Sequence, residues 1–140
     1  MASFNKFNSF VEALAEKKHD LGADTLKVLL TNAAPIATNT VKANLTEITA
    51  ANGYTAGGAT ASITSSSQTS GTYKLVLGDP ATWTAAGGTI GPFRYAVLYN
   101  DTATNDELIG WWDYGSSITL AIGESFAVDF DPSTGVLTIA

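Results

Sequence analysis

The chain has 140 residues, a formal net charge of -6 and a sequence pI of about 4.4, and it contains no cysteine. Without a thiol, disulfides, thiol catalysis and thiolate metal sites are excluded, and the acidic balance disfavours nucleic acid because its phosphates would be repelled. The length suits one domain that needs no covalent staple to bury its core. We therefore expect a single domain over residues 1–140, with residues 1–22 as an N-terminal arm and residues 23–140 as its main body.

The N-terminal arm carries the one helical pattern of the chain, over residues 4–19. Apolar side chains recur there at steps of three and four: Phe4, Phe7, Phe10, Val11 and Leu14. Gly22 is placed to end the helix. We predict an amphipathic helix whose phenylalanines pack either on this domain or on a neighbouring subunit.

The rest of the chain has the pattern of an antiparallel β-domain. Residues 26–31 (LKVLLT) are apolar on both faces, which indicates a central strand. From Ala59 onward, short strand-like segments alternate with turn signals, and no helical pattern separates them. The fold class that we expect is mainly β, an antiparallel β-sandwich (or barrel) with one N-terminal α-helix.

Two of these segments support finer predictions. In FRYAVLYND, the residues Phe93, Tyr95, Val97 and Tyr99 alternate with the others and are expected on one face of a strand. The sequence DPSTG, residues 131–135, predicts a hairpin between the last two strands, with Gly135 at a positive φ.

Residues 32–58 form a long segment with little regular pattern, punctuated by Pro35, by Asn52–Gly53 and by Gly57–Gly58. Loops of this length in compact domains commonly contact a partner or carry function. We therefore expect an interface here, with Pro35, Ile36 and Tyr54 as its candidate residues.

A cluster of aromatic residues, Trp111, Trp112 and Tyr114, is the second candidate for an interface. Adjacent residues of a strand point to opposite faces, so one tryptophan fills the core and the other faces outward. The outward tryptophan is either covered by the N-terminal helix or exposed as a binding hot spot. With the phenylalanines of the arm, the candidate interface residues are Phe4, Phe7, Phe10, Pro35, Ile36, Tyr54, Trp111, Trp112 and Tyr114.

The groups needed for catalysis are scarce. His19 is the only histidine, and we expect it to be exposed at a charged helix end without a role. Asp113, Asp129 and Asp131 are the carboxylates closest to a glycosidase pair, but Asp131 belongs to a turn and Asp129 points away from the core face. The sequence thus predicts a protein that is not an enzyme and has no catalytic, cofactor or metal residues.

Two further segments have simple interpretations. Residues 100–107 (NDTATNDE) are rich in oxygen ligands, but they lack the spacing of a calcium-binding EF-hand loop and are expected to form a solvated hairpin tip. The N-terminal sequence lacks the basic start and apolar run of a secretory signal, and no segment approaches the roughly 20 apolar residues of a membrane span. We expect a complete gene product that is made in a cytoplasm.

Five segments in order resemble a family of small virion proteins of tailed bacteriophages: TLKVLLTNAAP, LTEITAANGYTAGG, GGTIGPFRYAVLYND, LIGWWDYGSSITLAIGESFAVDF and GVLTIA. The resemblance spans residues 25–140 and is least developed in the N-terminal arm. It implies no catalytic residue. Glu47, Gly53, Tyr54, Gly110 and Gly123 match the family pattern, and we interpret them as turn and packing positions.

The resemblance implies a structural role in a virion, most like that of a capsid decoration (cement) protein. Such a protein would be a homotrimer bound to the major capsid protein on the outside of the head, with no nucleic acid, membrane or small-molecule partner. A tail-tube or fibre component is the first alternative. A carbohydrate-binding module that uses Trp111 or Trp112 as a stacking platform is the second.

Overall fold

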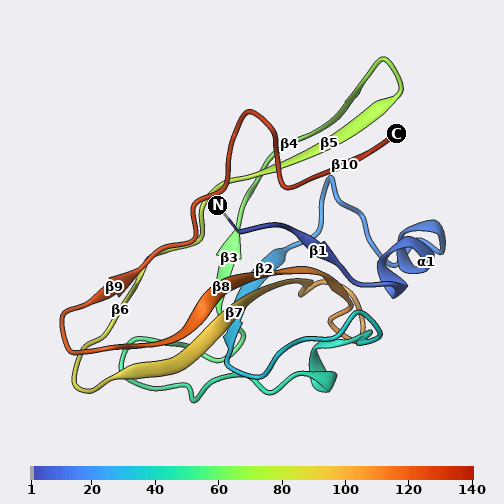
Figure 1. The fold of residues 1–140 in the computed structure, drawn as a ribbon. Coiled ribbons are helices and arrows are strands. Elements are labelled where there is room, and N and C mark those ends of the chain that lie inside the picture. Colours follow the sequence, from blue (N-terminus) through green and yellow to red (C-terminus); the bar gives the residue numbers. More distant parts are fainter. Residues whose placement is uncertain (1) are drawn as a thin grey trace.

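The computed structural model of the protein describes residues 2–140 and consists mainly of antiparallel β-structure (Figure 1). The strands are β1 (Asn5–Lys6), β2 (Leu26–Thr31), β3 (Ala59–Ala61), β4 (Ile63–Thr69), β5 (Thr72–Leu77), β6 (Trp83–Thr84), β7 (Ile90–Asn100), β8 (Leu108–Leu120), β9 (Ser125–Phe126) and β10 (Leu137–Ile139). They are joined by the helix α1 (Ser9–Ala15) and the 3-10 turn η1 (Lys42–Asn44).

The strands form two main layers and a small ribbon. The five-stranded sheet has the order β1-β8-β7-β2-β3, the three-stranded sheet has the order β10-β5-β4, and β6 pairs with β9. Figure 1 shows β4, β5 and β10 on one side of the sheet that contains β2, β7 and β8. The predicted class, mainly β and antiparallel with one N-terminal helix, is therefore confirmed for the described residues, and their sheets do not close into a barrel.

The main core lies between the two sheets. Leu26, Val28 and Leu30 of β2 belong to the same buried cluster as Leu75 of β5 and Leu137 of β10. These side chains recur at every second residue of β2, as they must on one face of a strand. Burial of this apolar surface is the main force that holds the two layers together.

A second, smaller core lies on the opposite face of the five-stranded sheet. Leu29 of β2 packs there with Val97 and Tyr99 of β7 and with Phe7, and Leu45 from the long loop packs against them. β2 is thus buried on both faces and lies between β7 and β3. This confirms the central strand that its apolar sequence predicted. The loop of residues 32–58 serves as the cover of this second core.

The N-terminal arm differs from the predicted helix over residues 4–19. Only Ser9–Ala15 are helical, and Asn5 and Lys6 pair with Trp111 and Gly110 of β8. The extended backbone places Phe4 and Phe7 against opposite faces of the sheet edge, one in each core. A helix would have put both rings on one side. Burial of one ring in each core therefore favours the extended backbone over the helix that the periodicity predicted.

The helix also ends earlier than predicted. Its last turn closes where Lys17 takes a positive φ of 67° and the N–H of Lys18 donates to the carbonyl of Ala13 at 2.8 Å. This is the left-handed closure that usually recruits glycine, and Gly22 takes no part in it. Val11, predicted on the apolar face, is 52% exposed.

The strand β7 also departs from simple alternation. Phe93 is buried in the main core with Ala96 and Leu98, whereas Val97 and Tyr99 lie in the second core. Register shifts between β7 and β8 occur on both sides of Phe93. Such an irregularity reverses the face on which the following residues point, so the predicted common face of Phe93 and Tyr99 is wrong.

The DPSTG segment is a turn but does not join a hairpin. Gly135 has the predicted positive φ, 75°, and Asp131 accepts a hydrogen bond from the N–H of Ser133 at 2.8 Å. However, β9 before the turn pairs with β6, and β10 after it pairs with β5. The turn therefore carries the chain from the small ribbon to the three-stranded sheet, which local turn chemistry does not reveal.

Candidate functional site

The nine candidate interface residues fall into three classes of exposure. Phe7, Phe10, Pro35 and Tyr54 are buried, Phe4, Trp111 and Trp112 are half-buried, and Ile36 and Tyr114 are exposed. The exposed fraction is 58% for Ile36 and 57% for Tyr114. These two residues present the most surface to a partner, and the four buried residues support the fold from within.

Phe4, Trp112 and Tyr114 meet in an open groove of about 300 Å³. We call it the aromatic groove, and its other aromatic lining residues are Phe93, Tyr95, Phe126 and Phe130. It lies where β7 and β8 meet the chain segment that runs from β9 to the DPSTG turn. The main-core face of the five-stranded sheet therefore stays partly open at this end.

Contacts among the rings fix the walls of the aromatic groove. The ring centroid of Trp112 lies 5.3 Å from that of Phe4 and 5.4 Å from that of Phe130. Tyr114 meets Phe126 edge to face at 5.7 Å, which leaves more than half of Tyr114 exposed. Offset and edge-to-face geometries of this kind are favourable for aromatic pairs. The groove is thus a preformed apolar surface with Tyr114 at its rim.

Trp111 points to the other face of the sheet, as predicted for adjacent strand residues. Its ring centroid lies 4.5 Å from that of Phe7, beside the second core. Phe4 and Phe7, which flank the two residues of β1, therefore contact one tryptophan each. The N-terminal arm thus contacts both tryptophans through this edge strand, whereas the two predicted alternatives for the outward tryptophan were cover by a helix and exposure as a hot spot.

Arg94, which lines the aromatic groove, forms a bidentate ion pair with Asp113. Arg94 donates from Nε and one terminal nitrogen to the two carboxylate oxygens of Asp113, at 2.8 and 2.9 Å. This contact, together with a hydrogen bond from the N–H of Gly115, lowers the pKa of Asp113. The pair is solvent-exposed, so it fixes the orientation of the side chains more than it stabilises the fold.

Asp131, at the other end of the groove, is also held as an anion. Hydrogen bonds from Ser133 and from the hydroxyl of Thr134 lower its pKa to about 2. A glycosidase acid needs a raised pKa so that it carries a proton near neutral pH. The environments of Asp113 and Asp131 shift the pKa in the opposite direction, so neither carboxylate is suited to donate a proton.

The long loop is fastened to the sheet through Glu47. Its Oε1 accepts hydrogen bonds from the Tyr54 hydroxyl at 2.7 Å and from the N–H of Gly57 at 2.6 Å. The Tyr54 hydroxyl in turn accepts from the N–H of Leu30 at 3.0 Å. Burial, followed by the hydrogen bond to Glu47, raises the pKa of Tyr54. We call these contacts the Glu47 clamp.

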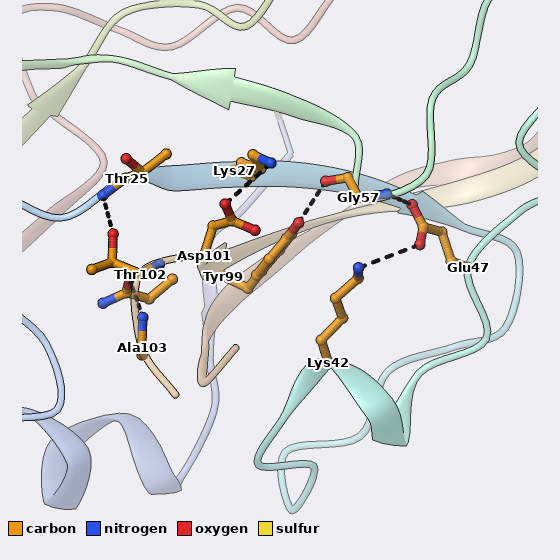
Figure 2. A network of polar contacts seen from close by, with 10 residues as sticks. Thr25, Lys27, Lys42, Glu47, Gly57, Tyr99, Asp101, Thr102 and Ala103 are labelled. Atoms are coloured by element: carbon orange, nitrogen blue, oxygen red, sulfur yellow. Dashed lines mark hydrogen bonds and ion pairs between the residues drawn. The ribbon is translucent and has the colours of Figure 1, made fainter. Parts of the chain in front are cut away.

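Figure 2 shows how the clamp continues to β7. The Tyr99 hydroxyl donates to the carbonyl of Gly57 at 2.7 Å, and Lys42 Nζ lies 3.8 Å from Glu47 Oε2. Lys42 Nζ is also 5.4 Å from the centroid of the Tyr99 ring. Lys42 of η1 and Tyr54 and Gly57 of the loop thus contact the Glu47 carboxylate, and Tyr99 of β7 holds the Gly57 carbonyl, so the loop is fixed to the sheet.

His19 is buried, contrary to the expectation that it is exposed. It is 5% exposed, and its Nδ1 accepts a hydrogen bond from the Asn100 amide at 3.0 Å. The same amide nitrogen donates to Asp24 Oδ2 at 2.6 Å. Because the helix ends at Ala15, the chain after it can bring His19 to Asn100, the last residue of β7. The prediction of an exposed His19 rested on its charged neighbours Lys17 and Lys18, which do not share its burial.

The predicted hairpin tip does join β7 to β8. Asn100 Oδ1 accepts from the N–H groups of Thr102 and Ala103, at 3.0 and 3.1 Å, and Lys27 Nζ contacts Asp101 at 3.1 Å (Figure 2).

No cluster of three or more potential metal ligands occurs within residues 2–140. None of the helical segments in that range is long and apolar enough to cross a membrane.

The aromatic groove gathers residues that sequence reasoning treated separately. Phe130 meets Trp112 only because of the path that the chain takes after β9, which no local sequence pattern encodes. Comparisons with protein-family models, curated proteins and solved structures gave no match to this chain.

Proposed function

We propose that this protein is a structural component of a tailed-bacteriophage virion that decorates the outside of the capsid and binds the lattice of the major capsid protein. The observation that carries the proposal is the phage-like pattern over residues 25–140. Four of its characteristic residues have clear structural tasks, because Glu47 and Tyr54 form the clamp and Gly53 and Gly110 stand where a side chain would meet backbone.

The close approaches at these glycines support that interpretation. A Cβ atom on Gly110 would lie 2.7 Å from the carbonyl oxygen of Asn5, in β1. Gly53 has a φ of 109°, in the region that favours glycine, and a Cβ there would overlap the carbonyl of Thr84. The residues of the pattern thus support a stiff scaffold in which the Glu47 clamp holds the loop of residues 32–58.

A stiff scaffold suits a protein that acts by binding alone. Cement proteins add contact area across subunit boundaries, and fixed loops lose little conformational entropy when they bind. Ile36 projects from the loop of residues 32–58, which the Glu47 clamp holds in place. We assign this loop surface to the major capsid protein.

The proposal includes a homotrimer that forms in the host cytoplasm and ends on the capsid exterior, without catalysis, cofactor or nucleic acid. Each copy then needs only a modest contact with the lattice, since a trimer engages several sites together.

The test is sedimentation of the purified protein with undecorated heads, after native mass spectrometry of the protein alone. We expect an assembly whose number of copies is a multiple of three, and we expect it to pellet with the heads. Ile36→Asp should weaken pelleting because a charge would replace an apolar contact, whereas Ile122→Asp, at a residue 68% exposed in the β8–β9 turn, should not. A protein that ignores heads, or that assembles into rings or tubes, would refute the capsid role and favour the tail.

A further inference from the structure

The strand β4 forms an open edge of the three-stranded sheet. Within residues 2–140, β4 pairs with β5 on one side and with no strand on the other. Figure 1 shows the β4–β5 hairpin extending away from the five-stranded sheet. β3 precedes β4 with only Ser62 between them, and it forms the open edge of the five-stranded sheet. One extended segment thus supplies an edge of both layers.

Alternate residues of β4 have backbone N–H and C=O groups that are free to bond to another strand. Thr69 and Thr72 are paired next to the two-residue turn of the hairpin, and Ser67 pairs with Lys74 of β5. In an antiparallel pair, the groups of alternate residues point toward and away from the partner. The N–H and C=O groups of Ser66 and Gln68 therefore point outward.

This edge lacks the usual protection against pairing with another strand. Natural edge strands carry lysine, proline or inward-pointing charge. Residues 48–73 contain no charged residue and no proline, in a chain with a net charge of -6. The register shift in this pair lies between Ile63 and Ser65, so residues 65–69 remain regular.

We propose that β4 pairs with β4 of a second copy of this chain, antiparallel and around a two-fold axis at Ser66. A two-fold contact requires a surface that complements itself. In this register Ser65 faces Ser67, and the irregular residues Ile63 and Thr64 fall at the ends of the contact, so no like charges meet. Because the rest of the chain is acidic, the uncharged edge is where two copies approach with the least repulsion.

The contact joins the two three-stranded sheets into one sheet of six strands. It is independent of the capsid role and also compatible with a three-fold contact elsewhere on the molecule. With β4 pairing alone the protein is a dimer, and with the proposed trimer it is a hexamer of two trimers. In both cases the assembly has an even number of copies, and loss of the β4 contact halves its mass.

The test compares Ser66→Lys with Ser116→Lys by native mass spectrometry and light scattering over a wide range of protein concentration. Ser66→Lys puts two ammonium groups opposite each other at the two-fold axis, and Ser116→Lys makes the same change at an exposed serine of β8. We expect an even-numbered assembly for the wild type and for Ser116→Lys, and half that mass for Ser66→Lys. Circular dichroism of each variant shows that the fold is retained.

A second variant tests the register directly. Ser66→Cys should form a disulfide-linked dimer under mild oxidation, because the spacing of directly opposed strand residues lies within the range that a disulfide spans. Ser116→Cys should not. A wild type that stays monomeric or odd-numbered, or an unchanged mass for Ser66→Lys, would overturn the inference. Protection of the Ser66 and Gln68 amides from hydrogen exchange only on heads would assign the edge to another protein instead.

Discussion

The side-chain amide of Asn100 donates a hydrogen bond to Nδ1 of His19 at 3.0 Å, and this contact determines the protonation state of the ring. Asn100 cannot turn its oxygen toward the ring without losing two bonds, since Oδ1 accepts from the N–H groups of Thr102 and Ala103. His19 is therefore neutral with its proton on Nε2, which has no hydrogen-bond partner among the described residues.

This arrangement predicts a loss of stability in mild acid. Burial lowers the pKa of His19 below its ordinary 6.5, against the opposing influence of Glu107 and Asp24. Well above pH 6.5 the ring is neutral in both the folded and the unfolded chain, so its contribution to stability is complete. As the pH falls from there through the folded pKa, the unfolded chain binds the proton more readily and the free energy of unfolding decreases.

The measurement is thermal unfolding of the wild type and of His19→Gln between neutral pH and pH 5. The glutamine oxygen can accept from Asn100 but does not titrate in this range, so the variant should show a shallower fall in Tm. Parallel pH profiles for the two proteins would refute the assignment of the acid sensitivity to His19.

Removal of the Glu47 carboxylate should loosen the long loop. Glu47→Ala leaves the Tyr54 hydroxyl and the Gly57 N–H without their acceptor, and we expect a loss of about 2 to 3 kcal/mol in the free energy of unfolding. Urea denaturation measures this loss. Tyr54→Phe should lower the free energy of unfolding by less than Glu47→Ala does. The double variant should lower it by less than the sum of the two single variants, because both changes disrupt the same hydrogen bond. Strict additivity would mean that the pair is not coupled.

Local patterns predicted the parts of the fold in which neighbouring residues share one environment. The doubly apolar sequence of β2 indicated a central strand, and the adjacent Trp111 and Trp112 indicated opposite faces. The positive φ of Gly135 followed from turn chemistry alone. In each case the sequence signal lies within a few consecutive residues.

Features that depend on distant segments were not predictable in this way. The spacing of Phe4 and Phe7 suits a helix, and only the edge of β8 makes the extended form better. The burial of His19 depends on Asn100, which is far away in the sequence. The aromatic groove likewise requires Phe130 to meet Trp112 after the chain has left the β6–β9 ribbon. Contacts between such distant segments cannot be predicted from local patterns in a single sequence.

The extended arm predicts different tolerance at two apolar positions. Phe7 is 0% exposed and Val11 is 52% exposed, although an amphipathic helix over residues 4–19 would bury both. Phe7→Asp should prevent folding or assembly, because an unpaired charge would replace a buried ring. Val11→Asp should change the free energy of unfolding by less than about 0.5 kcal/mol, as is usual at exposed positions. Circular dichroism and native mass spectrometry distinguish the two, and equal damage from both would favour the longer helix.

Gly110 tests the pairing of β1 with β8. A methyl group at this position would press against the ring of Phe4 and lie 2.7 Å from the Asn5 carbonyl oxygen, so Gly110→Ala must displace the arm. We expect a loss of about 1 to 3 kcal/mol in the free energy of unfolding, together with a shift in tryptophan fluorescence as Phe4 and Phe7 move away from Trp112 and Trp111. Gly78→Ala is the matched control, because its nearest neighbour would be the Thr64 hydroxyl at an ordinary 3.5 Å. If Gly110→Ala keeps wild-type stability and fluorescence, the arm does not pack on β8 in solution.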